Sequence, residues 1–136
     1  LEHIRTILNV MDKKEGLNWG MHLKNQTNLI GIIGLYRIKA EHSRCEIGYM
    51  LLPEYHNKGL VTEAIQTVLN YAFDRLQFHS VEAIIDPRNY PSEKVLLKNG
   101  FLKEGHIKEN EFFNGEFIDT MIYSILRKNF IAQRLD

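Results

Sequence analysis

The sequence predicts an α+β fold with a mixed sheet, in one domain covering residues 1–136. An apolar strand-like run at 44–52 is followed by a helical pattern from Gly59 and by a second strand-like run at 79–86. This order favours a right-handed crossover between parallel strands. Hairpin-like pairs of strands lie before and after this unit, so antiparallel pairing is expected as well.

The N-terminal part predicts a helix followed by a hairpin. Four apolar residues have the spacing of an amphipathic helix: Ile4, Ile7, Leu8 and Met11. After Gly16, residues 17–24 and 28–38 resemble two strands, and the polar residues 25–27 between them are typical of a turn.

The central part predicts a buried strand and a long helix. Residues 44–52 are apolar on both sides near their end and stop at Pro53, as expected of a strand covered on both faces. The helix from Gly59 has one apolar stripe, formed by Ile65, Val68, Leu69, Ala72, Phe73 and Leu76. The β-branched residues at 79–86 then predict the parallel partner strand.

The C-terminal part predicts a short helix and a second hairpin. Within residues 86–101, Pro91 suits the start of a helix and Gly100 its end. Two strand-like segments follow, and Asn114-Gly115 between them is the strongest short-range signal for a hairpin.

The composition excludes several functional classes. Seventeen basic residues balance seventeen acidic ones, so no overall charge attracts nucleic acid or an anionic membrane. No apolar run is long enough to span a bilayer, and no signal-peptide pattern is present. The single Cys45 and the scattered histidines lack zinc-ligand spacing. We therefore expect a cytoplasmic enzyme or binding module without a metal.

The stretch PEYHNKGLVTEAI, residues 53–65, joins the central strand to the helix. The free N–H groups of a helix N-terminus bind phosphate, and a glycine lets a ligand approach the backbone. The alternative is that Gly59 merely begins the helix. Neither the Walker nor the Rossmann glycine pattern occurs, which excludes these two nucleotide-binding modes.

Together with DPRNYPSEKVLLKNGF at 86–101, this turn resembles the GNAT superfamily of acetyl-CoA-dependent N-acetyltransferases. The resemblance implies about six or seven strands, helices on both faces, and a splay between the two central parallel strands that admits the pantetheine arm. The family's Arg/Gln-x-x-Gly-x-Gly/Ala turn falls on residues 56–61; Gly59 matches, whereas His56 and Val61 depart. The implied acetyl-CoA contacts are Met50, Leu51, Leu52, His56, Asn57, Lys58, Gly59, Leu60, Val61, Thr62, Asn89 and Ser92.

The pattern DP-x-N-x-x-S, with Leu96 where many members carry a tyrosine, is similar to the RimJ/RimL type, which acetylates N-termini of ribosomal proteins. The resemblance covers most of residues 1–130. Such enzymes begin with a strand and a helix that should precede Leu1, so we expect the domain to be N-terminally truncated.

The resemblance also implies catalytic roles. Backbone N–H groups of residues 50–52 would stabilise the oxyanion, and Ser92 would serve the leaving thiolate, with helix capping as its alternative role. Glu111 is the expected base, and Glu46 is the alternative. Tyr49 is expected in the core or the cleft wall.

The expected activity is transfer of acetyl from acetyl-CoA to a primary amine, foremost a peptide or protein N-terminus. An N-terminal α-amine, with a pKa of about 7.7 to 8.0, loses its proton more easily than lysine, at about 10.4. Acetylation of a small amine, such as a polyamine or aminoglycoside, and a CoA-binding sensor remain as alternatives. The sequence leaves open whether the chain forms a homodimer.

Overall fold

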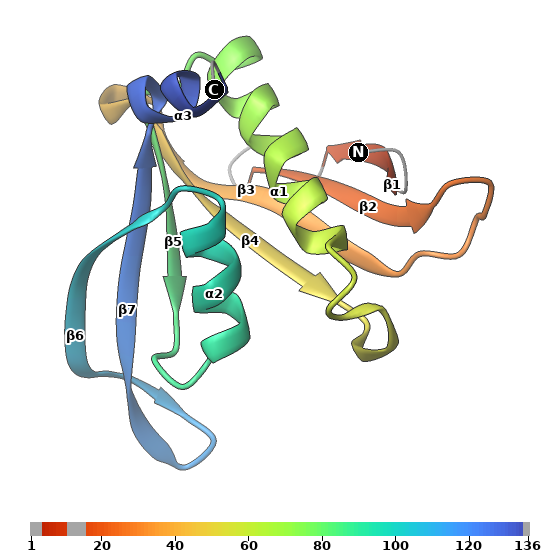
Figure 1. Ribbon diagram of the computed structural model, residues 1–136. Coiled ribbons are helices and arrows are strands. Elements are labelled where there is room, and N and C mark those ends of the chain that lie inside the picture. Colours follow the sequence, from red (N-terminus) through yellow and green to blue (C-terminus); the bar gives the residue numbers. More distant parts are fainter. Residues whose placement is uncertain (1–3, 11–15, 135–136) are drawn as a thin grey trace.

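The computed structural model describes residues 4–10 and 16–134, with the side chains described from residue 16 onward. Its seven strands form one sheet in the order β1-β2-β3-β4-β5-β7-β6 (Figure 1). The strands are β1 (Ile4–Val10), β2 (Leu17–Leu23), β3 (Gly31–Lys39), β4 (Arg44–Leu51), β5 (Ser80–Ile85), β6 (Leu102–Phe113) and β7 (Glu116–Leu126). The α-helices are α1 (Leu60–Asn70), α2 (Tyr90–Lys98) and α3 (Arg127–Arg134), and a π-helical turn, Tyr71–Arg75, extends α1.

The N-terminal helix predicted from the sequence is wrong for residues 4–10, which form β1; Met11 lies outside the described residues. β1 pairs antiparallel with β2 along its whole length, from Ile4 opposite Leu23 to Val10 opposite Leu17. The edge of β2 hydrogen-bonds the backbone of alternate residues of this segment, and β-branched residues such as Ile7 suit a strand. Tertiary pairing therefore overrides a helical spacing of only four apolar residues.

The other predicted strands and helices are present. β4 and β5 are parallel neighbours joined through α1, which confirms the predicted crossover. Their pairing covers only residues 44–46 of β4 and 80–82 of β5, whereas β4 stays paired with β3 as far as Leu51. Beyond Glu46 the two parallel strands diverge, as Figure 1 shows, and this is the splay expected from the resemblance.

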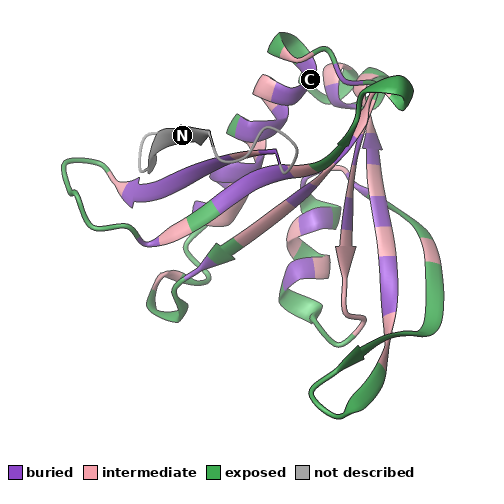
Figure 2. Cartoon of the chain, turned by 180° about the vertical axis from the view of Figure 1, so that it is seen from behind, coloured by how far each residue is buried: buried purple, intermediate pink, exposed green. Residues whose placement is uncertain are grey.

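One face of the sheet carries the core. The apolar stripe of α1 packs on this face, with Ile65, Leu69 and Phe73 fully buried. α2 adds Leu96, also fully buried. We expected helices on both faces; α1 and α2 lie on the same one, and α3 covers their C-terminal ends (Figures 1 and 2). The opposite face exposes side chains such as Met50, which is 73% exposed.

The β6-β7 hairpin projects from the sheet, and its tip is exposed (Figure 2). Asn114 and Gly115 both have positive φ, 54° and 83°, the conformation that a two-residue hairpin turn requires. The predicted Asn-Gly hairpin is therefore confirmed. Within the described residues, no helix is long and apolar enough to span a membrane.

Candidate active site

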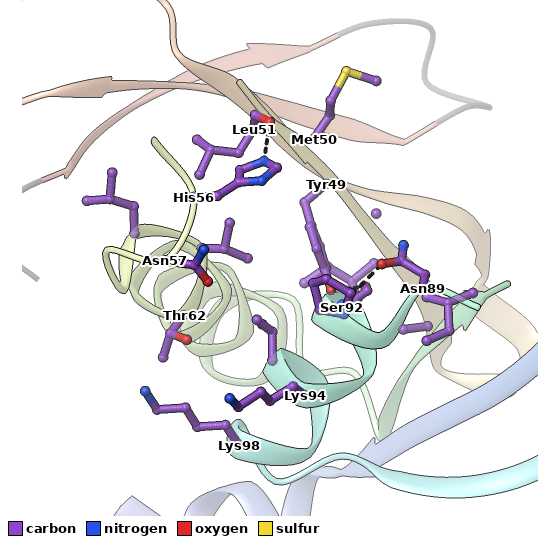
Figure 3. Close-up of a pocket in the computed structure, with 18 of the residues that line it drawn as sticks. Tyr49, Met50, Leu51, His56, Asn57, Thr62, Asn89, Ser92, Lys94 and Lys98 are labelled. Carbon is purple, nitrogen blue, oxygen red and sulfur yellow. Dashed lines mark hydrogen bonds between the residues drawn. The ribbon is translucent and has the colours of Figure 1, made fainter. Parts of the chain in front are cut away.

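The splay between β4 and β5 opens into a cavity of about 790 Å³. Its walls come from the end of β4, the 55–62 turn, the end of β5 and the exposed side of α2 (Figure 3). This volume is within the usual range of small-molecule sites, about 300 to 1,000 Å³. Most predicted contact residues of acetyl-CoA line this cavity: Met50, Leu51, His56, Asn57, Gly59, Leu60, Val61, Thr62, Asn89 and Ser92.

The turn before α1 presents backbone N–H groups to the cavity. Gly59 is the N-cap residue, with φ of 76°, and no side chain described in the structure caps the helix. The first intrahelical hydrogen bond runs from the Glu63 N–H to the Gly59 carbonyl at 3.1 Å, so the N–H groups of residues 60–62 precede it. A Cβ added to Gly59 would meet no atom within 4 Å, so the missing side chain leaves open space at the cavity. An uncapped helix start with such space suits an anion.

The His56 side chain is held against β4 instead of pointing freely into the turn. Its Nε2 lies 2.8 Å from the Leu51 carbonyl oxygen, and a carbonyl only accepts, so Nε2 donates (Figure 3). In the neutral ring Nδ1 then has no proton to donate. The backbone of the turn is therefore a better phosphate donor than this imidazole.

Lys58 lies outside the residues that line the cavity. Its ammonium group stands 5.7 Å from the centre of the Tyr55 ring, in a cation–π contact. Leu52 is likewise outside the lining and is 46% exposed. Lys58 and Leu52 are therefore the two of the twelve predicted cofactor contacts that do not line the cavity.

Two lysines on α2 supply positive charge that the motif analysis missed. Lys94 and Lys98 line the cavity and reach toward Thr62 at the start of α1 (Figure 3). Neither forms an ion pair within the described part of the chain. Their i, i+4 spacing places them on one face of the predicted helix. Only the position of α2 in the structure shows that this face lines the cavity.

The edge of β4 that faces the splay carries backbone donors. The Leu51 carbonyl points to His56, so the backbone of this residue faces away from β3. Strand alternation then places the N–H groups of Leu51 and Tyr49 toward the gap. The Leu52 N–H is bound to the Ile30 carbonyl at 2.9 Å, and Met50 pairs with Ile32 in β3. Of the three predicted oxyanion donors, only Leu51 therefore has its N–H on the splay side.

α2 brings two predicted residues together in the wall of the cavity. Asn89 is its N-cap residue, and its side-chain oxygen accepts from the Ser92 N–H at 3.2 Å. Ser92 is not the cap; its hydroxyl lies 2.6 Å from the Tyr49 hydroxyl of β4. Burial raises the pKa of Tyr49, and the hydrogen bond to Ser92 lowers it by a smaller amount.

The loop before α2 is tied down by ionic contacts. Asp86 accepts hydrogen bonds from the backbone and guanidinium of Arg88, and these contacts lower the pKa of Asp86. Arg88 also donates to Glu116 of the hairpin at 2.9 Å. On α2 itself, Glu93 accepts a hydrogen bond from the Tyr123 hydroxyl of β7. α2, and with it Ser92, is therefore anchored to the β6-β7 hairpin.

The two predicted bases lie outside the residues that line the cavity. Glu46 follows the buried Cys45 on β4, so alternation turns it to the open face of the sheet. Burial raises the pKa of Glu46, Arg37 at 3.4 Å lowers it, and Glu82 and Glu111 raise it further. The charge of Glu111 on β6 thus reaches Glu46 on β4, although the two residues are far apart in the chain.

The geometry combines an uncapped helix start, a channel between diverging strands and the hydroxyl groups of Tyr49 and Ser92 in its wall. A long anionic thioester such as acetyl-CoA fits this donor set: residues 59–62 with Lys94 and Lys98 suit its phosphates, and the splay suits its pantetheine arm. Residues 1–102 match the family described as Acetyltransferase (GNAT) domain.

Comparison with known proteins agrees with this match. The chain is 36% identical over 124 residues to an uncharacterized N-acetyltransferase, YoaA, of Bacillus subtilis (strain 168), covering 91% of the chain and 70% of YoaA. It is 30% identical over 118 residues to the ribosomal-protein-serine acetyltransferase of Escherichia coli (strain K12), covering 85% and 65%. A crystal structure of mutant forms of the spermidine/spermine N-acetyltransferase SpeG from Vibrio cholerae superposes with a TM-score of 0.83 at 28% identity, covering 90% and 70%. The chain belongs to the GNAT acetyltransferase family.

Proposed function

We propose that this protein transfers the acetyl group of acetyl-CoA to a primary amine, foremost the N-terminal α-amine of a peptide or protein. The observation that carries the proposal is the splay of β4 and β5 beside the uncapped N-terminus of α1. The similarity to a ribosomal-protein-serine acetyltransferase supports an acceptor of the RimJ/RimL type. A ribosomal acceptor would place the reaction in the cytoplasm.

Binding is assigned to residues on both sides of the cavity. The N–H groups of residues 60–62 would hold the diphosphate, and Lys94 and Lys98 would add charge from α2. The open space at Gly59 allows close approach to the backbone. When bound, acetyl-CoA supplies an activated acyl group as a thioester.

The chemistry requires three functions from the chain. The Leu51 N–H, facing the gap, would stabilise negative charge on the carbonyl oxygen, a contribution of about 2.7 to 4 kcal/mol for one such donor. Glu111 or Glu46 would accept the proton of the amine, directly or through water. Ser92, in the cavity wall, would stabilise the leaving sulfur.

A small polycation is the second candidate acceptor. Glu82 and Glu111 both raise the pKa of Glu46, which pairs with Glu82 at the end of the β4-β5 pairing. Three carboxylates there would attract a protonated amine. The similarity to the spermidine/spermine N-acetyltransferase supports this acceptor class too.

The test is release of free coenzyme A from acetyl-CoA by the full-length protein against N-terminal peptides, polyamines and aminoglycosides. Turnover with peptides, abolished when their α-amine is blocked, is the expected result. Turnover with polyamines alone would support acetyl transfer but show that the acceptor is a small polycation instead of a peptide N-terminus. Acetyl-CoA binding without turnover on any amine would contradict the enzyme and favour a sensor.

A further inference from the structure

A hydrogen bond between Tyr49 and Ser92 joins β4 to α2 within the cavity. The two hydroxyl oxygens are 2.6 Å apart, and both residues line the cavity. Ser92 is 8% exposed, and its own N–H is bound to Asn89. Tyr49 is held on the helix-facing side of β4, three residues beyond the last parallel pair with β5, at Glu46. The phenol therefore stands inside the splay and has a fixed orientation.

The neighbouring turn of α2 explains why a phenol from β4 is needed here. Leu96 lies one helical turn after Ser92, and its aliphatic side chain has no proton to donate. A serine hydroxyl is a much weaker acid than a phenol, whose ordinary pKa is about 10. Among the hydroxyl groups of Tyr49 and Ser92, only the phenol is acidic enough to give a proton to a thiolate.

We propose that Tyr49 is the proton donor to the leaving sulfur and that Ser92 positions the phenol and stabilises the phenolate. This inference rests on the acetyl transfer proposed above. As the C–N bond forms and the C–S bond breaks, the electron pair of the C–S bond stays on sulfur, and the Tyr49 O–H proton passes to it. Ser92 then donates a hydrogen bond to the Tyr49 phenolate and keeps its own proton. Solvent returns the proton to the phenolate after coenzyme A leaves, and the amine proton goes to the carboxylate base.

The electrostatics agree with this role. Burial raises the pKa of Tyr49, so the phenol holds its proton at neutral pH and is ready to act as an acid. The hydrogen bond to Ser92 opposes this shift because it favours the phenolate. A general acid must hold its proton before the reaction and release it in the transition state. Burial of Tyr49 serves the first requirement, and the hydrogen bond to Ser92 serves the second.

The test is steady-state kinetics and acetyl-CoA binding by full-length Tyr49→Phe, measured with the best acceptor of the wild type. The variant keeps the ring and removes the proton. We expect kcat to fall by about a hundredfold or more, within the range for general acid catalysis, with the Kd of acetyl-CoA changed less than threefold. Tyr71→Phe is the matched control, because Tyr71 packs on Trp19 away from the cavity, and it should keep the wild-type kcat.

A second variant separates proton donation from positioning. In Ser92→Ala the phenol keeps its proton but loses the hydroxyl that orients it, so we expect kcat to fall by less than in Tyr49→Phe. Full kcat in Tyr49→Phe, or a loss confined to acetyl-CoA affinity, would overturn the inference while leaving the acetyl transfer intact. An inactive wild type that binds acetyl-CoA would contradict the proposed function itself, and the role of Tyr49 with it.

Discussion

The charge of Glu111 on β6 raises the pKa of Glu46 on β4, so one candidate base affects the titration of the other. Burial is the largest cause of the raised pKa of Glu46, and Arg37 opposes it. A base must be deprotonated to act, so a raised pKa moves the acid limb of the pH profile of kcat/KM to higher pH. The two carboxylates can therefore be distinguished by how each substitution moves that limb.

If Glu111 is the base, Glu111→Gln lowers kcat/KM about a hundredfold, most clearly below the pKa of the amine where the carboxylate is still ionised, and leaves acetyl-CoA affinity unchanged. Glu46→Gln then keeps most of the activity. If Glu46 is the base, the outcomes exchange: Glu46→Gln is inactive, and Glu111→Gln moves the acid limb to lower pH because a cause of the raised pKa is removed. Equal and small losses in both variants would reject both assignments.

Arg37 gives an independent check on Glu46. Its guanidinium lies 3.4 Å from the Glu46 carboxylate and is the cause that lowers the pKa of that carboxyl. Arg37→Met removes this cause, so the pKa of Glu46 rises further. With Glu46 as the base, the acid limb of kcat/KM should move to higher pH in Arg37→Met; an unmoved limb would exclude Glu46 as the base.

Gly59→Val should abolish acetyl-CoA binding. The side chain would occupy the open space beside the free N–H groups, and φ of 76° is unfavourable for a β-branched residue. Gly115→Val is the matched control, because Gly115 also has positive φ and open space but lies at the hairpin tip. Isothermal titration with acetyl-CoA should show binding by the control alone. Binding by Gly59→Val with wild-type affinity would remove the phosphate site from this turn.

Lys94→Ala and Lys98→Ala should each weaken acetyl-CoA binding by about threefold to tenfold, as expected for exposed charges. S-acetylpantetheine lacks the nucleotide phosphates, so its affinity should be the same in both variants and the wild type. Lys103→Ala on β6 serves as a control outside the cavity. Equal losses for both ligands would place the lysines against the pantetheine arm and contradict the phosphate assignment.

Phe130→Ala should destabilise the fold by about 3 to 5 kcal/mol in urea unfolding. Phe130 on α3 is fully buried, and its ring centre lies 5.2 Å from that of Phe73. Asn129→Ala, on the exposed side of the same helix, should cost little. A small loss for Phe130→Ala would mean that α3 contributes little to the core.

The sequence predicted the strands and helices of the core, because their apolar periodicity reports which face is buried. Residues 44–52, the stripe from Ile65 to Phe73 and the Asn114-Gly115 turn all have the predicted structure. Residues 4–10 were predicted wrongly because their pairing with β2 is a long-range contact. α3 was missed, since its burial rests mainly on Phe130 and leaves no apolar stripe.

Those parts of the site that depend on a short stretch of sequence were predictable, because a local motif determines the conformation of its own backbone. The turn at Gly59 and the Asn89 cap are of this kind. The contact of Tyr49 with Ser92 and the influence of Glu111 on Glu46 join residues far apart in the chain. Such contacts depend on where α2 and β6 settle on the sheet, and no local pattern in the sequence reports that position.

Transfer of labelled acetyl from acetyl-CoA to an amine tests the central claim most directly. Full-length protein would be incubated with acetyl-labelled acetyl-CoA and N-terminal peptides, and the label located by mass spectrometry, with Gly59→Val in parallel. The account predicts label on the acceptor amine with the wild type and none with Gly59→Val. Unlabelled acceptors with a wild type that binds acetyl-CoA, or equal labelling by Gly59→Val, would contradict it.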